Sequence, residues 1–269
     1  MSTGTPAGSA DLYFTLLGQL TIVKDGVDHA PSAPKLLQLL GLLLLRPGSV
    51  VPNTTIVEEL WGEDPPRSVR STMQTYIYHL RRCIERNGLA ADAEALLATS
   101  PPGYRLAVAE TQTDVSLFLD RRRQGQALLS VGRHAEAAQH FRDALDLWSG
   151  PPLANVACGP VLSRYVVTLQ EQYRNAMHLR IEADIAVGSH RELIGELRSN
   201  AAAAALDESV HGQLMRVLAR SGRRVEAMTI FRDLRQRLVD ELGVEPCAEL
   251  QALYIGLLAG GPEPLLDAG

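Results

Sequence analysis

Residues 64–87 carry arginine, amide and hydroxyl side chains at a spacing that places them along one side of a helix. Arg can donate two hydrogen bonds to guanine and Gln can pair with adenine, while hydroxyl groups contact phosphates or base edges. This side of the helix therefore suits the major groove of DNA. The alternative interpretation is the solvated face of an ordinary amphipathic helix. The polar side chains are Arg67, Ser71, Gln74, Thr75, Tyr78 and Arg82, with Arg70 and Arg81 on the flank.

The opposite side of the same helix is apolar, which predicts that it packs against a protein core. The helix is expected over residues 66–86. Its apolar side chains recur at helical spacing and are Val69, Met73, Tyr76, Ile77, Leu80 and Ile84.

Positive charge is concentrated in this helix, although the chain as a whole is acidic. The net charge is −5, but residues 67–86 hold five arginines and one glutamate, which gives a local charge of +4. Because attraction to phosphate depends on the local charge, the net charge does not exclude a nucleic-acid partner.

The segments around this helix predict the other elements of a small domain. Strand patterns over residues 11–29 flank an Asp25-Gly26 turn and predict an antiparallel sheet. Helices are expected over 34–46 and 54–61, with Asn53 as the cap of the second. A hairpin is expected around residues 101–103.

The order of sheet, two helices, long helix and hairpin is that of an OmpR-like winged helix-turn-helix. Residues 62–66 would form the turn, and a four-stranded sheet would lead the domain. The hairpin would form the wing, with Arg105 beside a phosphate or the minor groove.

Beyond residue 114 the pattern is helical and repeats. The segment Gly132-Arg-His-Ala-Glu-Ala returns in related form at Gly188 and Gly222, and the last two glycines are 34 residues apart. This is the period of tetratricopeptide-type helix pairs, in which the glycine ends one helix before the next begins. Large apolar residues stand nine positions after each glycine, at Phe141, Leu197 and Phe231.

No residue set in the sequence supports catalysis, a metal site or a cofactor. Cys83, Cys158 and Cys247 are too far apart for a metal-ligand pattern or a disulfide framework. No phosphate-binding loop of the type G-x-x-x-x-G-K-[ST] occurs. We therefore expect a non-enzymatic protein without a cofactor. With no apolar run long enough for a membrane span, it is expected to act in the cytoplasm, at the nucleoid.

Motifs spread over most of the chain support a family resemblance. They are Leu17-Gly18, Pro34-Lys35, Glu59-Leu60-Trp61-Gly62, Pro65-Pro66, Gln74-Thr75-Tyr76, Leu80-Arg81-Arg82, Pro102-Gly103-Tyr104, Trp148-Ser149-Gly150-Pro151, Arg180-Ile181-Glu182-Ala183 and Glu241-Leu242-Gly243-Val244-Glu245-Pro246. In this order they resemble the Streptomyces antibiotic regulatory protein (SARP) family of transcriptional activators.

The resemblance implies a mainly α protein with two domains. An OmpR-like winged helix would occupy residues 11–110, and an all-α, tetratricopeptide-like bacterial transcriptional activation domain would occupy 111–259. Residues 1–10 and 260–269 are expected to be a disordered arm and tail. The implied partners are double-stranded promoter DNA, bound at direct repeats by a homodimer or tandem dimer, and RNA polymerase holoenzyme with its sigma factor. The implied target is an antibiotic biosynthetic cluster.

The candidate DNA contacts come from the helix-turn-helix and the wing. They are Lys35, Asn53, Thr54, Arg67, Arg70, Ser71, Gln74, Thr75, Tyr78, Arg81, Arg82 and Arg105. Arg81 has an alternative role in an ion pair with Glu85, one helical turn away. Trp61 and Tyr76 are assigned to packing.

Four acidic residues precede the basic helix and have two interpretations. Glu58, Glu59, Glu63 and Asp64 form either a solvated face or a contact to a basic surface of the polymerase.

A second class of function remains open from the sequence. The repeat domain could serve an adaptor that binds a protein or phosphopeptide, with the winged helix as a protein contact. Salt-sensitive, sequence-selective DNA binding by residues 1–112 would distinguish the two classes.

Overall fold

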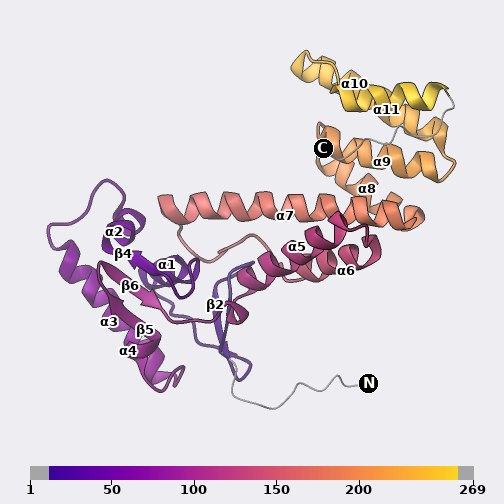
Figure 1. Cartoon of the computed structure of the whole chain (residues 1–269). Coiled ribbons are helices and arrows are strands. Elements are labelled where there is room, and N and C mark those ends of the chain that lie inside the picture. The colour runs from indigo at the N-terminus through magenta and orange to yellow at the C-terminus, as the bar shows by residue number, and fades with distance from the viewer. Residues whose placement is uncertain (1–11, 260–269) are drawn as a thin grey trace. The chain divides into compact units, whose positions relative to one another are not determined.

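The computed structural model describes residues 12–259, apart from the side chains of residues 190 and 191 (Figure 1). The arm and tail predicted for residues 1–10 and 260–269 lie outside the described residues. The chain forms two compact units. One contains the residues up to Gln124 with His140–Ala176, and the other contains Gly125–Gln139 with the residues from Met177 onward. The domain boundary expected near residue 110 stays a prediction.

The first unit begins with a small antiparallel sheet of order β1-β2-β3. Its strands are β1 (Tyr13–Thr15), β2 (Thr21–Lys24) and β3 (Val27–Asp28). Asp25 and Gly26 both have positive φ, 52° and 76°, as the predicted two-residue hairpin turn requires. Within the described residues this sheet has three strands where four were expected. Thr113 adds a single parallel bridge to Phe14.

The helix-turn-helix and the wing follow, as predicted. The elements are α1 (Pro34–Leu44), β4 (Val50–Pro52), α2 (Asn53–Trp61), α3 (Val69–Arg86), α4 (Ala93–Leu96), β5 (Leu97–Ser100) and β6 (Gly103–Leu106). The second sheet has the order β4-β6-β5, with both pairs antiparallel. Met73, Ile77, Leu80 and Ile84 of α3 are buried, so the predicted apolar side is confirmed.

The boundaries of three elements differ from the prediction. Helix α3 begins at Val69 rather than at residue 66, because Ser68 has non-helical φ −92° and ψ 22°. Asn53 is the first residue of α2 and not its cap, since Pro52 occupies that position. The short α4 was not predicted, and it is capped by Asp92, which accepts hydrogen bonds from two backbone N–H groups.

The rest of the described chain is helical, as predicted. A 3₁₀ turn at Glu110–Gln112 precedes α5 (Asp114–Ser130), α6 (His134–Leu145), α7 (Pro160–Val187), α8 (His190–Ala203), α9 (Glu208–Arg220), α10 (Arg224–Leu242) and α11 (Ala248–Ala259). The three repeat glycines, Gly132, Gly188 and Gly222, have positive φ between 74° and 94° and separate consecutive helices, which confirms their predicted role. No helix in the described part of the chain is both long and apolar enough to cross a membrane.

The second unit packs α8, α9 and α10 around an apolar core, joined by the end of α7 and by α11. Leu197 and Phe231, two of the large apolar residues predicted from the repeat, are buried in this core. Phe231 also stacks on Tyr254 of α11, with ring centroids 4.2 Å apart.

In the first unit, a buried glutamate joins α2 to the beginning of α7. The Glu59 carboxylate accepts hydrogen bonds from the backbone N–H groups of Gly159 (2.6 Å), Val161 (2.9 Å) and Leu162 (2.9 Å). The first N–H groups of a helix have no partner within it and carry partial positive charge, so an anion is stabilised there. Gly159 has no space for a side chain, since a Cβ would lie 2.1 Å from the Glu59 carbonyl oxygen.

A second buried carboxylate fixes the first hairpin to the start of α5. Asp114 accepts hydrogen bonds from the backbone N–H groups of Leu16 and Leu17, at 2.7 and 2.8 Å, and from that of Val115. Burial raises the pKa of Asp114, and these N–H groups act against the rise. The segment around Asn155 lies along the same hairpin, because Asn155 exchanges two hydrogen bonds with the backbone of Leu20. The winged helix is therefore held by residues well beyond its own sequence.

We predict that Glu59→Gln lowers the free energy of unfolding by about 2–3 kcal/mol, because the amide removes the charge and places an NH₂ among N–H donors. Glu58→Gln is the matched control. Glu58 is exposed and pairs with Arg164 at 2.7 Å, so its loss should cost less than about 1 kcal/mol. Urea unfolding followed by circular dichroism measures both. Equal stability of the two variants would contradict the assigned role of Glu59.

Candidate nucleic-acid interface

The outward side of α3 and the turn before it form what we call the recognition surface. Because the apolar side of α3 is buried, the polar side chains a half-turn away face solvent. Tyr78 lies near the middle of this surface and is 58% exposed. The recognition surface consists of Arg67, Arg70, Ser71, Gln74, Thr75, Tyr78 and Arg82, all of them exposed.

The charged and amide groups of this surface are largely unengaged. Arg67 and Arg70 have no hydrogen-bond or ion-pair partner among the described residues, and neither has the side-chain amide of Gln74. Arg82 makes an ion pair with Glu85 at 3.5 Å, and both side chains are about half exposed, so the pair is weak. These side chains are free to bind an anion or the edge of a base.

The hydroxyl groups are already partly engaged by the helix itself. Ser71 Oγ donates to the carbonyl of Ser68 at 2.9 Å, and Thr75 Oγ1 donates to that of Ser71 at 2.9 Å. Each oxygen keeps its acceptor capacity and faces solvent.

Arg81 does not belong to the recognition surface. Its Nε and Nη2 donate to the carbonyl of Leu97 at 3.1 and 2.9 Å, and Nη2 also donates to Thr99 Oγ1 at 2.9 Å. Its side chain is 18% exposed and pairs with Glu94 at 3.2 Å, so the alternative pairing with Glu85 is wrong. The predicted DNA contact at Arg81 is corrected to a brace between α3 and β5.

Lys35 is also directed into the protein. Its ammonium donates to the carbonyl of Leu60 near the end of α2 and to Gln38 Oε1 at 3.1 Å. A cation is stabilised at the carboxyl end of a helix, where carbonyl groups have no helical partner. Lys35 therefore holds α1 against α2 and is not placed to bind phosphate.

The remaining candidates lie outside α3. Asn53 and Thr54 are exposed at the start of α2. Arg105 is exposed on β6 of the wing, opposite Val50 on one side and Ala98 on the other. No side-chain partner for Arg105 occurs among the described residues.

The four acidic residues before α3 separate into two pairs. Glu59 is 1% exposed and holds the start of α7, so neither predicted role fits it. Glu58 pairs with Arg164 on the surface. Glu63 and Asp64 are exposed in the connection between α2 and α3, without a side-chain partner among the described residues.

Two further assignments concern the aromatic and cysteine side chains. Trp61 and Tyr76 are half-buried and stack on each other with centroids 6.1 Å apart, in agreement with packing roles. The Cys83 thiol is half-buried near the carbonyl of His29. Among residues 12–259, no group of His, Cys, Asp and Glu side chains is suited to hold a metal ion.

Two family descriptions cover most of the chain. Residues 29–106 match the C-terminal domain of transcriptional regulatory proteins, and residues 113–258 match the bacterial transcriptional activator domain.

The curated relatives of this chain are regulatory proteins. The regulatory protein DnrI of Streptomyces peucetius is 38% identical over 257 residues, which cover 93% of both chains. The regulatory protein AfsR of Streptomyces coelicolor is 33% identical over 94% of this chain, but the match spans only 25% of AfsR.

A solved structure supports the same assignment. Mycobacterium tuberculosis EmbR, in complex with a low-affinity phosphopeptide, is similar to this chain with a TM-score of 0.86 and 29% identity. The match covers 94% of this chain and 66% of EmbR. The chain therefore belongs to the SARP family of transcriptional activators, with an OmpR-like winged helix followed by a bacterial transcriptional activator domain.

Proposed function

We propose that the chain binds promoter DNA sequence-specifically and activates a secondary-metabolite biosynthetic cluster by recruiting RNA polymerase holoenzyme. The observation that carries the proposal is the recognition surface. Its arginines and its glutamine are held outward by a buried apolar side and make few contacts within the protein.

The proposed contacts divide by chemistry. Arg70 and Gln74 are one helical turn apart on α3, so a guanidinium and an amide face adjacent base pairs of the major groove. Arg67 in the turn before α3 and Arg105 on the wing neutralise phosphates on either side. Tyr78 contributes a large exposed ring whose hydroxyl contacts a base edge or a phosphate.

Binding to direct repeats follows from this geometry if two protomers bind in tandem. Each protomer places one α3 in one major groove, and equivalent grooves on the same face of DNA recur about every 34–36 Å. Two copies on consecutive repeats would therefore present the same side to the polymerase.

The polymerase contact is assigned to the connection between α2 and α3. Glu63 and Asp64 there are exposed and unpaired among the described residues, whereas Glu58 and Glu59 are used within the protein. We assign Glu63 and Asp64 to a basic surface of the holoenzyme, its sigma factor included.

The other candidate function is an adaptor whose repeat domain binds a phosphopeptide. Its support is the similar EmbR chain, which was solved in complex with a phosphopeptide, although EmbR is longer than this chain. Sequence-selective DNA binding by the full chain distinguishes the two. The full chain is required because Asp114, which holds the first hairpin, lies outside residues 1–112.

For DNA binding, we predict that Arg70→Gln weakens binding to the native promoter about tenfold or more, through loss of a bidentate contact. The matched control is Arg232→Gln, which makes the same charge change at an exposed position of α10. Promoter mobility shifts over a series of salt concentrations measure both. Equal affinity of the two variants would overturn the proposed recognition surface.

A second prediction separates two adjacent arginines. Arg81→Gln should lower the free energy of unfolding by about 1–3 kcal/mol, because the part-buried carbonyl of Leu97 and the hydroxyl of Thr99 lose their donor. Arg82→Gln should leave stability within about 0.5 kcal/mol and weaken DNA binding instead. Thermal unfolding and mobility shifts of both variants test this. Loss of stability in Arg82→Gln and loss of DNA binding alone in Arg81→Gln would contradict these roles.

A third prediction concerns activation. The double variant Glu63→Gln with Asp64→Asn should bind promoter DNA at least as tightly as the unmodified chain, since it removes two negative charges near the DNA. It should nevertheless lose most of its stimulation of transcription with purified holoenzyme. Full stimulation by this variant would exclude the acidic connection as the polymerase contact.

A further inference from the structure

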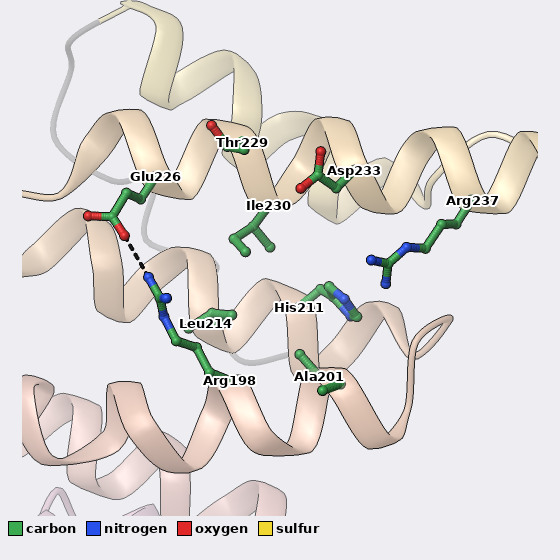
Figure 2. A pocket seen from close by; sticks show the side chains of 10 residues that line it. Arg198, Ala201, His211, Leu214, Glu226, Thr229, Ile230, Asp233 and Arg237 are labelled. Carbon is green, nitrogen blue, oxygen red and sulfur yellow. Dashed lines mark hydrogen bonds and ion pairs between the residues drawn. The ribbon is translucent and has the colours of Figure 1, made fainter.

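A pocket lies between α8, α9 and α10, entirely within the second unit and apart from the recognition surface. Its volume is about 360 Å³, in the range of sites for small organic ligands. Figure 2 shows that side chains from all three helices line it. Nothing in the proposed contacts with DNA or polymerase uses this pocket.

The floor of the pocket is apolar. Leu214 of α9 is fully buried beneath it, and Ala201 of α8 is 7% exposed. Ile230 of α10 is half-buried and points from the opposite side toward Leu214 (Figure 2). An apolar group that entered here would lose contact with water without leaving a polar group unpaired.

One side of the pocket is closed by an ion cluster in which one carboxylate pairs with two guanidinium groups. Glu226 makes ion pairs with Arg198 at 2.5 Å and with Arg223 at 2.7 Å. Hydrogen bonding by Arg223 holds the pKa of Glu226 below its usual range. Because Arg198 is already paired with this carboxylate, a ligand would have to break that ion pair to bind it.

The other side carries an imidazole nitrogen and a guanidinium that are not engaged. His211 is 4% exposed, and its Nδ1 lies 2.8 Å from the carbonyl oxygen of Asp207. A carbonyl only accepts, so Nδ1 carries the proton and Nε2 is left without a partner among the described residues. Arg237 is exposed and also unpartnered there, and its guanidinium extends from α10 toward His211 (Figure 2).

We propose that this pocket binds an apolar molecule that ends in a single carboxylate. The apolar body would lie against Ala201, Leu214 and Ile230. The two carboxylate oxygens would accept hydrogen bonds from the Arg237 guanidinium, beside the His211 ring. The planar guanidinium of Arg237 is suited to a planar anion with two oxygens.

The charges on the rim argue for a single negative charge. The Asp233 carboxylate lines the pocket one helical turn from Arg237 and has no partner among the described residues. It would repel a dianion such as a phosphate group more strongly than a monoanion. The chemistry therefore favours a carboxylate over a phosphopeptide.

Such a carboxylate has two sources, a free organic acid or the carboxyl terminus of a protein partner. The two are separated by the probes. 4-Phenylbutyrate represents the free acid, with 4-phenylbutyramide as its uncharged control. An alanine-rich hexapeptide that ends in leucine represents a chain terminus, in its free and amidated forms. The proposal is supported if either acid binds more tightly than its own amide. The acid that binds more tightly of the two identifies the source of the carboxylate.

The test is calorimetric titration of the full chain with these four probes. We expect Arg237→Gln to weaken binding of the preferred acid about tenfold, and the matched change Arg232→Gln, on the same helix outside the pocket, to leave it unchanged. Ala202→Trp, at an exposed position that lines the pocket, should block binding by filling it. Circular dichroism confirms that each variant is folded.

Two results would overturn the proposal. One is the absence of binding by both acids at millimolar concentration, or binding of each amide as tightly as its acid. The other is equal binding of the acid by the Arg237→Gln and Arg232→Gln variants, because the ligand would then make no contact with the Arg237 guanidinium.

Discussion

The orientation of the helix-turn-helix depends on one buried anion, the Glu59 carboxylate. It sits at the amino end of α7 and accepts three backbone N–H groups that no helical carbonyl can reach. Gln38 donates to the same carboxylate and in turn accepts from Lys35, whose ammonium binds the last turn of α2. The Glu59 carboxylate and the Lys35 ammonium both have hydrogen-bond partners in this network. Their charges are therefore stable within the protein.

The network fixes α2, the helix that precedes α3 in the helix-turn-helix. Helix α2 is held from one side by α1 and from the other by the beginning of α7, and it leaves α3 with one packed side. Position 159 requires glycine, because a side chain there would separate the backbone of residue 159 from Glu59. The basic surface is thus presented by a rigid base within the first unit.

Arginines of the same chemistry have three different roles in this helix region. Arg81 is saturated by acceptors on β5, Arg82 is partly screened by Glu85, and Arg70 is unengaged. A chain of net charge −5 can therefore present a positive surface, because many acidic side chains elsewhere are paired with arginines or bound by backbone N–H groups.

The sequence predicted the features that depend on local spacing. The period of Met73, Ile77 and Leu80 identified the buried side of α3, and the Asp25-Gly26 pair identified the hairpin of β2 and β3. The repeat glycines marked the helix ends because only a residue without Cβ adopts positive φ at low cost.

The features that were missed depend on residues distant in sequence. A helical wheel gives the direction of Arg81 but not the β5 carbonyl that lies there, 16 residues on. The acceptors and donors of Lys35 and Glu59 lie 25 and about 100 residues away, so an exposed role was the natural interpretation of their charge. The DNA contacts of the recognition surface stay predictions.

The internal use of Arg81 has a consequence for genetics. In a screen for mutants that fail to activate a reporter gene, substitutions of Arg81 and of Arg70 would both be found. The causes of the two defects are nevertheless different. Loss of the brace enlarges the unfolded fraction, which cellular proteases remove, so the protein level falls. An immunoblot of the protein level would therefore distinguish residues that stabilise the winged helix from residues that contact its operator.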